Sequence, residues 1–389
     1  MNVLFVTYDF PYPMTSGGKN RAYHLLKYAA KEANIILYSF VREDYNPDSN
    51  EEIKKLGIKK IFVTKRRKLR SVSNIPLTLF RNFSIFKTLY YEKYVFEELK
   101  KIIHEEKITV VHFESSYTGF YIGRELKKMG VKIVLGTENI EHMLYYDYAK
   151  NLKKFYLKPF IKYQASKLKK EEIDMMRRSD VVTVITDDEK NILKENFNIQ
   201  SEIVANGIEP ESFSYEFSEK KHNNILFVGN FTYFPNTDAF EFFLKEVFPK
   251  IDNKTTVTVI GKQASLKFKN TDKRIIKKDF VEDIIAEYRN ADMLVFPIRI
   301  GGGTNFKVLE AMSLGVPIIA NPARLSGLRA KSDEHFLPAV SADEYISQIQ
   351  KMEDAALRKK LSINARKLIE EYYAWDTIGK ELLRVWKSQ

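Results

Sequence analysis

The sequence predicts an α/β protein of the doubly wound type, with two domains that each contain a parallel sheet. Short apolar, β-branched segments alternate with longer helical stretches along the chain of 389 residues. The alternation stops once, at a polar and turn-prone stretch over 208–223, and then resumes. Strands that are separated by helices pair in parallel and need helices on both faces of the sheet. We therefore expect a first Rossmann-like domain over 1–207, a linker over 208–223 and a second Rossmann-like domain over 224–371.

The predicted strands follow the apolar segments in chain order. In the first domain they are Val3–Thr7, Ile35–Phe40, Lys60–Thr64, Val110–Phe113, Lys132–Leu135, Val181–Ile185 and Glu202–Ala205. In the second domain they are Ile225–Val228, Thr256–Ile260, Arg274–Lys277, Met293–Phe296, Pro317–Ala320 and Phe336–Leu337. Sheets of this type bind ligands beyond the carboxyl ends of their strands, so the residues that follow each strand are the first candidates for function.

Composition restricts the class of protein. An apolar fraction of 44% with 29% charged residues is typical of a globular protein, and no apolar run reaches the roughly 18 residues that a membrane span requires. The absence of cysteine excludes disulfides, thiolate catalysis and cysteine metal sites. The opening segment, Met1–Tyr8, lacks the basic flank and long apolar region of a signal peptide. We expect a first strand there and a cytoplasmic protein.

The net charge of +12 is partly local. The segment 150–170 contains eight lysines and no acidic residue, and aromatic residues are interleaved with the lysines. Such a segment suits the anionic inner face of a membrane, with the protein bound there peripherally. A solvated basic helix is the plainer alternative. Nucleic acid is a third partner of positive charge, but no nucleic-acid-binding motif occurs, so we expect no nucleic-acid partner.

The stretch 297–317 carries the strongest functional signal. The strand Met293–Phe296 runs into three glycines, and a helix is predicted to open at Thr304 and to end at Gly315. Glycines allow close approach to the backbone, and the free amides of a helix start attract an anion. The amides in question belong to Gly302, Gly303, Thr304 and Asn305.

Two side chains of this predicted helix strengthen the signal. Lys307 lies in the first turn, where a cation opposes the helix dipole unless an anion binds there. Glu310 lies one turn deeper on the same face and offers a carboxylate to hydroxyl groups. The element thus suits a diphosphate and a polyol. The alternative is an ordinary strand–loop–helix crossover with a surface lysine.

Polar residues and glycines also follow other strands. In the first domain the candidates are Ser16, Gly17, Gly18, Arg21 and Glu138. In the second they are Gly229, Asn230, Lys262 and Arg299. Turns themselves favour Gly, Ser and Asn, so many of these residues need no functional explanation. The same preference does not explain the charged residues among them.

An aromatic pattern precedes the fourth predicted strand. Phe80, Phe83, Phe86, Tyr90 and Tyr94 are three or four residues apart and would share one helix face. Such a stripe favours the core, with an apolar wall for an acceptor as the alternative.

Several phrases of the sequence, in this order, resemble those of family 4 glycosyltransferases, which have the GT-B fold. The resemblance covers nearly the whole chain. It rests on Ser16-Gly17-Gly18 with Arg21, Glu138-Asn139-Ile140-Glu141, Ser179-Asp180, Val204–Ile208, Ile225–Asn230 with Pro235-Asn236, Phe280–Asp283, Gly301–Pro317, Arg366 and Tyr373–Trp375.

The resemblance implies two domains that face each other across a cleft, with the nucleotide-sugar donor in the second and the acceptor in the first. It also implies that a last helix, near 372–389, packs back on the first domain. The acceptor would be a glycan or a lipid-linked glycan, in the synthesis of cell-surface polysaccharide or glycoconjugate. The donor would be a nucleotide-diphosphate sugar, with UDP favoured over GDP and no cofactor. The reaction would be metal-independent and would retain the anomeric configuration.

Residue roles follow from the same resemblance. Lys307, with the amides of residues 302–305, would hold the diphosphate, and Glu310 would accept hydrogen bonds from the ribose. A backbone group of Val281 would contact the base. Glu138 and Lys307 are the predicted catalytic residues. Glu138 would orient the acceptor or the donor sugar, and the alternative is a loop acid that caps the next helix. Asp187-Asp188-Glu189 is interpreted as a helix start and not as a metal site.

The sequence departs from the family at three places. Gly302 stands where many relatives have a first glutamate, and Asn230–Tyr233 lacks the arginine and lysine that commonly hold the diphosphate. Glu138 stands where a histidine is common. Lys307 is expected to supply the cation instead, with Arg299 or Lys262 as further candidates. A catalytically weak or inactive nucleotide-sugar-binding protein therefore stays open as an alternative, as does a sugar-nucleotide epimerase.

Overall fold

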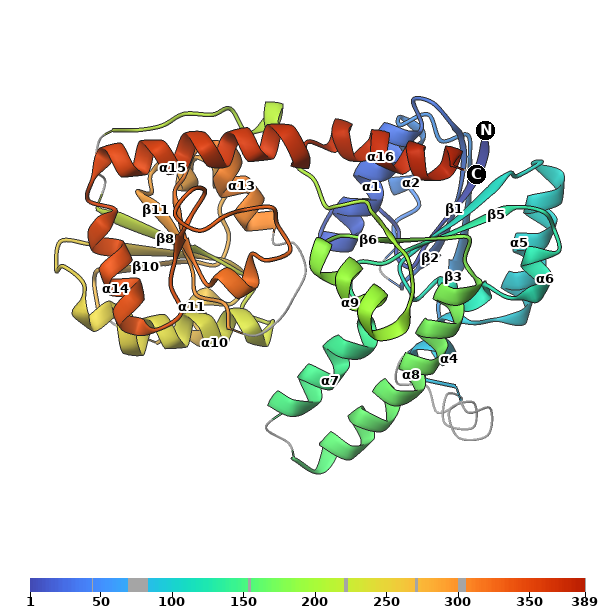
Figure 1. Ribbon diagram of the computed structural model, residues 1–389, viewed down its shortest axis with the longest axis horizontal. Coiled ribbons are helices and arrows are strands. Elements are labelled where there is room, and N and C mark those ends of the chain that lie inside the picture. Colours follow the sequence, from blue (N-terminus) through green and yellow to red (C-terminus); the bar gives the residue numbers. More distant parts are fainter. Residues whose placement is uncertain are drawn as a thin grey trace. The chain divides into compact units, whose positions relative to one another are not determined.

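The computed structural model describes residues 1–43, 45–68, 83–152, 155–219, 223–269, 272–299 and 306–388. It divides into two compact units (Figure 1). The first unit consists of Met1–Asn206 and Trp375–Gln389, and the second consists of Gly207–Ala374. Each unit contains one parallel sheet with helices, so the predicted α/β class with two sheets is confirmed.

The first unit has a sheet of seven strands in the order β3-β2-β1-β4-β5-β6-β7. The strands are β1 (Asn2–Thr7), β2 (Asn34–Val41), β3 (Lys60–Lys65), β4 (Val110–Glu114), β5 (Lys132–Gly136), β6 (Val181–Val184) and β7 (Glu202–Ile203). The helices of this unit are α1 (Gly17–Ala29), α2 (Ser49–Lys54), α4 (Ile85–Tyr90), α5 (Lys93–Glu105), α6 (Arg124–Lys127), α7 (Glu141–Asn151), α8 (Lys158–Arg178), α9 (Asp187–Phe197) and α16 (Trp375–Lys387). The strand order reverses between β1 and β4, which is where a doubly wound sheet places its ligand.

The second unit has a sheet of six strands in the order β10-β9-β8-β11-β12-β13. The strands are β8 (Asn224–Val228), β9 (Thr256–Ile260), β10 (Ile275–Lys278), β11 (Met293–Phe296), β12 (Ile318–Ala320) and β13 (Leu337–Pro338). The helices are α10 (Phe234–Phe242), α11 (Ala264–Lys267), α12 (Ile284–Arg289), α13 (Phe306–Leu314), α14 (Ala342–Lys351) and α15 (Ala355–Leu368). Here the reversal lies between β8 and β11.

Burial explains why the strands could be read from the sequence. Every residue from Val3 to Val6 of β1 is fully buried, as is expected for a central parallel strand that is covered on both faces. Such a strand is a continuous apolar run with polar residues only at its ends. The thirteen predicted strands all occur, with ends that shift by no more than two residues; the largest change shortens Glu202–Ala205 to Glu202–Ile203.

The last helix, α16, packs against α1 of the first unit. Gly379 lies so close to Tyr28 that an added Cβ would come within 2.5 Å of the Tyr28 Cβ. The ring of Trp375 stacks on His24 with centroids 4.9 Å apart. The C-terminal helix thus completes a unit whose other elements all lie within Met1–Asn206.

The predicted aromatic stripe does not share one helix face. The helix α4 ends at Tyr90, because Tyr91 is extended, and Tyr94 lies on the separate helix α5. Tyr90 is buried and Phe86 packs against the core, whereas Tyr94 is 57% exposed. Phe80 lies outside the described residues. Spacing alone could not show that the helix breaks between the two tyrosines.

Candidate functional site

A buried ion pair joins α1 to β4 at the carboxyl end of the first sheet. Arg21 Nε donates to Glu114 Oε1 at 2.6 Å, and both side chains are 1% exposed. Arg21 Nη1 also donates to Ala205 O at 2.9 Å and to Asn206 Oδ1 at 3.1 Å. The guanidinium therefore connects the end of β4 to the segment after β7. Arg21 Nη2 is buried and has no hydrogen-bond partner among the described residues.

His112 and Trp386 support the same carboxylate. Trp386 Nε1 donates to His112 Nδ1 at 3.1 Å, so the other ring nitrogen is left to donate to Glu114 Oε2 at 2.7 Å. Burial raises the pKa of Glu114, but the charge of Arg21 and the hydrogen bond from His112 outweigh it and hold that pKa at about 2. Glu114 is thus a fixed anion, oriented by a residue of the C-terminal helix.

Glu138 has the opposite electrostatics. It follows β5 and lies against the start of α1, where a Cβ added to Gly18 would come within 2.7 Å of Glu138 Oε1. Burial, and then the negative charge of Glu114, raise the pKa of Glu138 to about 8. Its Oε1 is buried and has no hydrogen-bond partner in the described part of the chain. At neutral pH this carboxyl is protonated and can donate a hydrogen bond to a substrate oxygen.

The loop before α1 is shaped by this contact. Ser16 caps the helix by accepting from Lys19 N at 3.4 Å, and both Ser16 and Gly17 are exposed. Gly18 is buried, and an added Cβ would lie 2.1 Å from the Tyr8 hydroxyl oxygen. Glycine is therefore needed at residue 18 for close approach, and the structure brings Gly18, Arg21 and Glu138 to one region of the first unit.

We predict that Glu138→Gln changes the pH dependence of stability. Because the folded pKa of about 8 lies above the usual 4.5, wild-type Glu138 destabilises the fold increasingly as pH rises from 4.5 to 8. The variant should raise the free energy of unfolding at pH 9 and leave it nearly unchanged at pH 4. Urea unfolding at both pH values measures this. An equal effect at both would contradict the raised pKa.

The acids beside Glu138 have structural partners. Glu172 of α8 accepts from Glu141 N at 3.0 Å and from His142 N at 3.1 Å, so it caps α7. Tyr117 donates to Glu141 Oε2 at 2.7 Å, while burial raises the pKa of Glu141 to about 7. The amides at the start of α7 are therefore already occupied by a carboxylate from within the protein.

In the second unit, Lys307 lies in the first turn of α13. Its Nζ donates to Asn236 Oδ1 at 2.9 Å and lies 5.3 Å from the ring centroid of Phe296. Burial lowers the pKa of Lys307 to about 8, against a smaller upward effect of Glu310. No carboxylate of the described residues forms an ion pair with this ammonium. A bound anion would supply the missing countercharge.

Glu310 lies one turn further along α13. Tyr288 of α12 donates to Glu310 Oε2 at 2.9 Å and also reaches Lys307 O at 3.1 Å. Burial raises the pKa of Glu310, and the hydrogen bond from Tyr288 and the charge of Lys307 partly offset that rise. The buried Tyr288 hydroxyl thus holds one oxygen of the Glu310 carboxylate and fixes the orientation of that carboxylate.

The loops after β8 and β9 pack directly on one another. Gly261 has a φ of 143°, and an added Cβ would come within 1.9 Å of Gly229 O, so only glycine fits there. Asn236 Nδ2 donates to Asn230 O at 2.9 Å, which ties the loop after β8 to the side chain that holds Lys307. Gly229 and Asn236 are thus brought together with Lys307.

The remaining predicted donor residues are placed less centrally. Arg299 forms a paired contact with Asp238, at 3.0 Å from Nε and 2.7 Å from Nη2, so a carboxylate already neutralises it. Asn230 and Lys262 are exposed, and Val281 is partly buried in the loop after β10. Gly302, Gly303, Thr304 and Asn305 lie outside the described residues. The helix that follows them ends at Leu314, and Gly315 has a φ of 81°, as the predicted stop requires.

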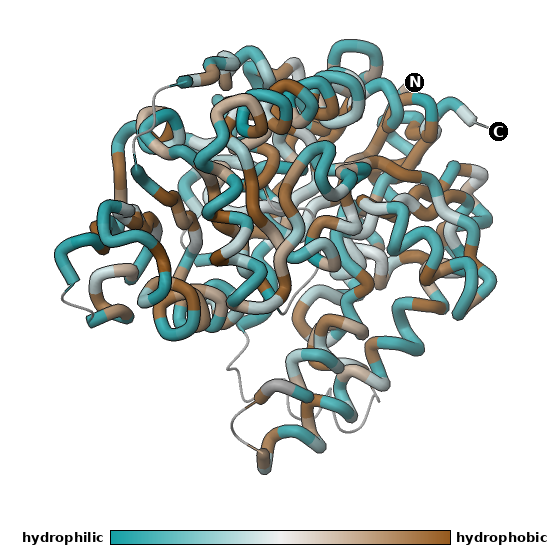
Figure 2. Tube along the Cα trace, turned by 60° about the vertical axis from the view of Figure 1, so that its left-hand side comes forward, coloured by the Kyte–Doolittle hydropathy of each residue, from teal (hydrophilic) through white to brown (hydrophobic). Residues whose placement is uncertain are grey.

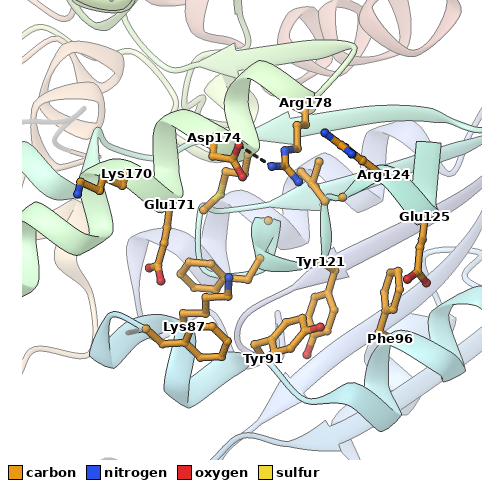
Figure 3. Close-up of a pocket in the computed structure, with 16 residues that line it drawn as sticks. Lys87, Tyr91, Phe96, Tyr121, Arg124, Glu125, Lys170, Glu171, Asp174 and Arg178 are labelled. Carbon is orange, nitrogen blue, oxygen red and sulfur yellow. Dashed lines mark ion pairs between the residues drawn. The ribbon is translucent and has the colours of Figure 1, made fainter. Parts of the chain in front are cut away.

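A separate pocket of about 650 Å³ lies on the flank of the first unit (Figure 3). Aromatic rings that include Tyr91, Phe96 and Tyr121 form one wall, and Asp174 pairs with Arg178 at 2.8 Å on the opposite side. Lys87 Nζ lies 4.4 Å from the ring centroid of Phe83. The pocket is lined from α4, α5, α6, α8 and the segment after β4, and it contains none of the predicted site residues.

Some members of the two clusters were not among the predicted site residues. These are His112, Glu114, Asn206, Asn236, Tyr288 and Trp386. Glu114, Asn206 and Asn236 lie at predicted strand ends or at a helix start, so their positions in the sequence could have marked them as candidate site residues. Nothing local marks Tyr288 or Trp386, because each reaches its partner only through the packing of distant elements.

The described residues contain neither a membrane-spanning helix nor a metal site. No helix there is both long and apolar enough to cross a bilayer. No group of three or more His, Asp or Glu residues in the same ranges is arranged to hold a metal ion.

Two family models match the chain. The model described as Glycosyltransferase Family 4 matches residues 15–212, which is just over half of the chain. The model described as Glycosyl transferases group 1 matches residues 222–354. No curated protein sequence matches.

Solved structures share the fold over the full length. Sucrose-phosphate synthase from Thermosynechococcus elongatus is 14% identical with a TM-score of 0.72, and the match covers 100% of this chain and 98% of that one. HepE from Anabaena, in complex with UDP, is 11% identical with a TM-score of 0.69, and both chains are covered in full (100%). WaaG, a glycosyltransferase involved in lipopolysaccharide biosynthesis, is 12% identical with a TM-score of 0.67 and 100% coverage of both chains.

Proposed function

The chain belongs to glycosyltransferase family 4, and on that premise we propose that it transfers a sugar from a nucleotide-diphosphate donor to an acceptor hydroxyl with retention of configuration. The observation that carries the proposal is Lys307, a cation that lies at the start of α13 without an anionic partner among the described residues and whose pKa burial lowers to about 8. A bound diphosphate would offset the free-energy cost of keeping the buried Lys307 ammonium charged. In this proposal the donor binds to the second unit and the acceptor to the first.

The transfer breaks the bond between the anomeric carbon and the phosphate oxygen. Negative charge then develops on the leaving diphosphate, and Lys307 stabilises it together with the amides that precede α13. The acceptor oxygen bonds to the anomeric carbon on the same face, and its proton passes to an oxygen of the leaving phosphate. Lys307 and the amides supply the positive charge, so the scheme does not call on a metal ion.

Glu138 and Arg21 act on the acceptor side in this proposal. The protonated Glu138 carboxyl donates a hydrogen bond that orients a sugar hydroxyl. Arg21 Nη2 has no hydrogen-bond partner in the described residues and offers a donor beside it. Glu114 keeps the guanidinium in place through its contact of 2.6 Å. The acceptor class that we propose is a glycan or lipid-linked glycan of the cell surface.

The donor is proposed to be a UDP sugar. Support comes from HepE, whose structure was solved with UDP and with UDP-glucose. Release of UDP or GDP from a panel of nucleotide sugars, with and without glycan acceptors, tests the reaction. A thermal-shift screen of UDP and GDP tests the base, because a bound ligand raises apparent stability by mass action. No nucleotide release with any donor would count against transfer.

Glu310→Gln should weaken nucleotide binding by about tenfold. The variant keeps an acceptor for Tyr288 but loses the charge that strengthens hydrogen bonds from ribose hydroxyls, which is worth about 1–2 kcal/mol. Titration calorimetry with UDP measures the change. Glu287→Gln, on α12 of the same unit, is the matched control, since Glu287 accepts from Lys278 and lies outside the proposed site. Unchanged affinity in Glu310→Gln would refute the ribose contact.

A nucleotide-sugar-binding protein without transfer activity is the second candidate. The observation that favours it is the loop Asn230–Tyr233, which contains no cationic residue. Nucleotide binding without release from any donor and acceptor pair would support this candidate over the enzyme.

A further inference from the structure

The hairpin of α7 and α8 ends in a cluster of exposed aromatic side chains. The two helices pack side by side, and the hairpin extends away from the sheet of the first unit (Figure 1). Between Phe155 and Tyr163 every side chain is at least partly exposed. We call 155–163 the hairpin tip. Its exposed large residues are Phe155 (76%), Tyr156 (63%), Leu157 (37%), Phe160 (49%) and Tyr163 (55%).

This exposure is unusual for aromatic residues, which normally bury most of their surface. Figure 2 shows hydrophobic positions interleaved with hydrophilic ones along the end of the hairpin. Tyr148, in the last turns of α7, is also 50% exposed. Several exposed aromatic side chains on one projecting hairpin indicate a surface that a binding partner covers.

The charged residues around the tip indicate what kind of partner covers it. No aspartate or glutamate occurs from Tyr148 to Lys170. Lys162, Lys169 and Lys170 are exposed, and Lys150 is 71% exposed beside Asp147 at 3.1 Å. Lys158 Nζ donates to Lys150 O at 2.9 Å and so joins the two helices. Aromatic rings beside lysines match the headgroup region of an anionic bilayer, whereas a second copy of the tip would bring like charges together.

We propose that the hairpin tip docks this protein on an anionic membrane surface, with Phe155, Tyr156 and Phe160 inserted among the headgroups and the lysines contacting lipid phosphates. The docking adds to the proposed transfer reaction and does not depend on it, because the tip contains none of the proposed site residues. It would keep the protein at the surface where a lipid-linked acceptor is found.

Flotation with lipid vesicles tests the proposal. The wild-type chain should bind vesicles of phosphatidylcholine mixed with phosphatidylglycerol and should not bind phosphatidylcholine alone. Phe155→Ser/Tyr156→Ser should weaken binding at least tenfold. The control Tyr94→Ser/Leu266→Ser removes exposed apolar side chains elsewhere, 57% and 69% exposed, and should bind as wild type.

The lysines are tested separately. Lys162→Gln should weaken binding about fivefold, which corresponds to about 1 kcal/mol per basic residue near the surface. Lys254→Gln, an exposed lysine of the second unit, should have no effect. Circular dichroism shows whether each variant is folded, and nucleotide binding shows whether the proposed site is intact.

Three outcomes would overturn the docking proposal. These are no binding to anionic vesicles, equal binding to neutral vesicles, and full binding by the folded tip variant. Sedimentation that shows a dimer which the tip variant abolishes would assign the patch to a second copy instead. A tip variant that loses vesicle binding but keeps normal sugar transfer would support docking. A wild-type protein that binds vesicles but transfers no sugar would count only against the proposed reaction.

Discussion

Lys307→Ala is expected to slow sugar transfer by about 100-fold to 1,000-fold, the range found when one preorganised group that stabilises transition-state charge is removed. The reason is that Lys307 is the cation on α13 with no anionic partner in the described residues and with an amide oxygen, Asn236 Oδ1, at 2.9 Å. The fold should survive, because the change removes a group whose charged form burial disfavours. Turnover with the matched donor measures the effect.

Lys254→Ala is the control for this change. It removes the same charge from an exposed position just before β9, at the amino ends of the strands and opposite the proposed site at their carboxyl ends. Its turnover should equal that of the wild type. A rate for Lys307→Ala within a few-fold of wild type, in a folded protein, would remove Lys307 from the mechanism.

The pH dependence of nucleotide binding gives an independent check on Lys307. Its pKa of about 8 in the free protein means that the ammonium loses its proton above that pH, so diphosphate binding should weaken as pH rises through 8. A bound diphosphate favours the charged form, so binding at pH 8.5 should take up a proton. Calorimetry in buffers of different ionisation enthalpy detects this uptake, and Lys307→Ala should abolish it.

Arg21→Met is expected to destabilise the first unit by about 3–5 kcal/mol, because it leaves Glu114 as a buried charge without its partner. Glu114 is 1% exposed, and its pKa of about 2 depends on Arg21 and His112. The contacts to Ala205 O and Asn206 Oδ1 are lost as well. Urea unfolding at pH 7 measures the loss.

Two further variants test whether the destabilisation by Arg21→Met comes from the buried ion pair. Arg21→Met/Glu114→Gln removes both charges and should recover part of the stability. Arg384→Met breaks the exposed contact between Arg384 and Glu202, whose side chains are 55% and 45% exposed, and should cost less than about 1 kcal/mol. Equal effects of Arg21→Met and Arg384→Met would contradict the assignment of a buried ion pair.

The strands and the sheet class could be predicted because the signal for them is local. A central parallel strand is covered on both faces, so it stands out as an apolar run such as Val3–Thr7, and its neighbours in sequence show where it ends. The helix after β11 was equally readable, because Gly315 and Pro317 stop it. The prediction that Phe86, Tyr90 and Tyr94 share one helix face was wrong, because periodicity gave no sign that α4 ends at Tyr90.

What the sequence by itself determined is therefore the α/β architecture, the family and the residue types at the strand ends. Only the tertiary structure decided which of these meet: Arg21 with Glu114, Lys307 with Asn236, and Trp386 with His112, partners that lie 93, 71 and 274 residues apart. It also decided that Arg299 is occupied by Asp238 and that Glu138 and Lys307 have shifted pKa values. The physical reason is that secondary structure follows short-range patterns, whereas contact and burial, which set charge and protonation, depend on elements that only the folded chain brings together.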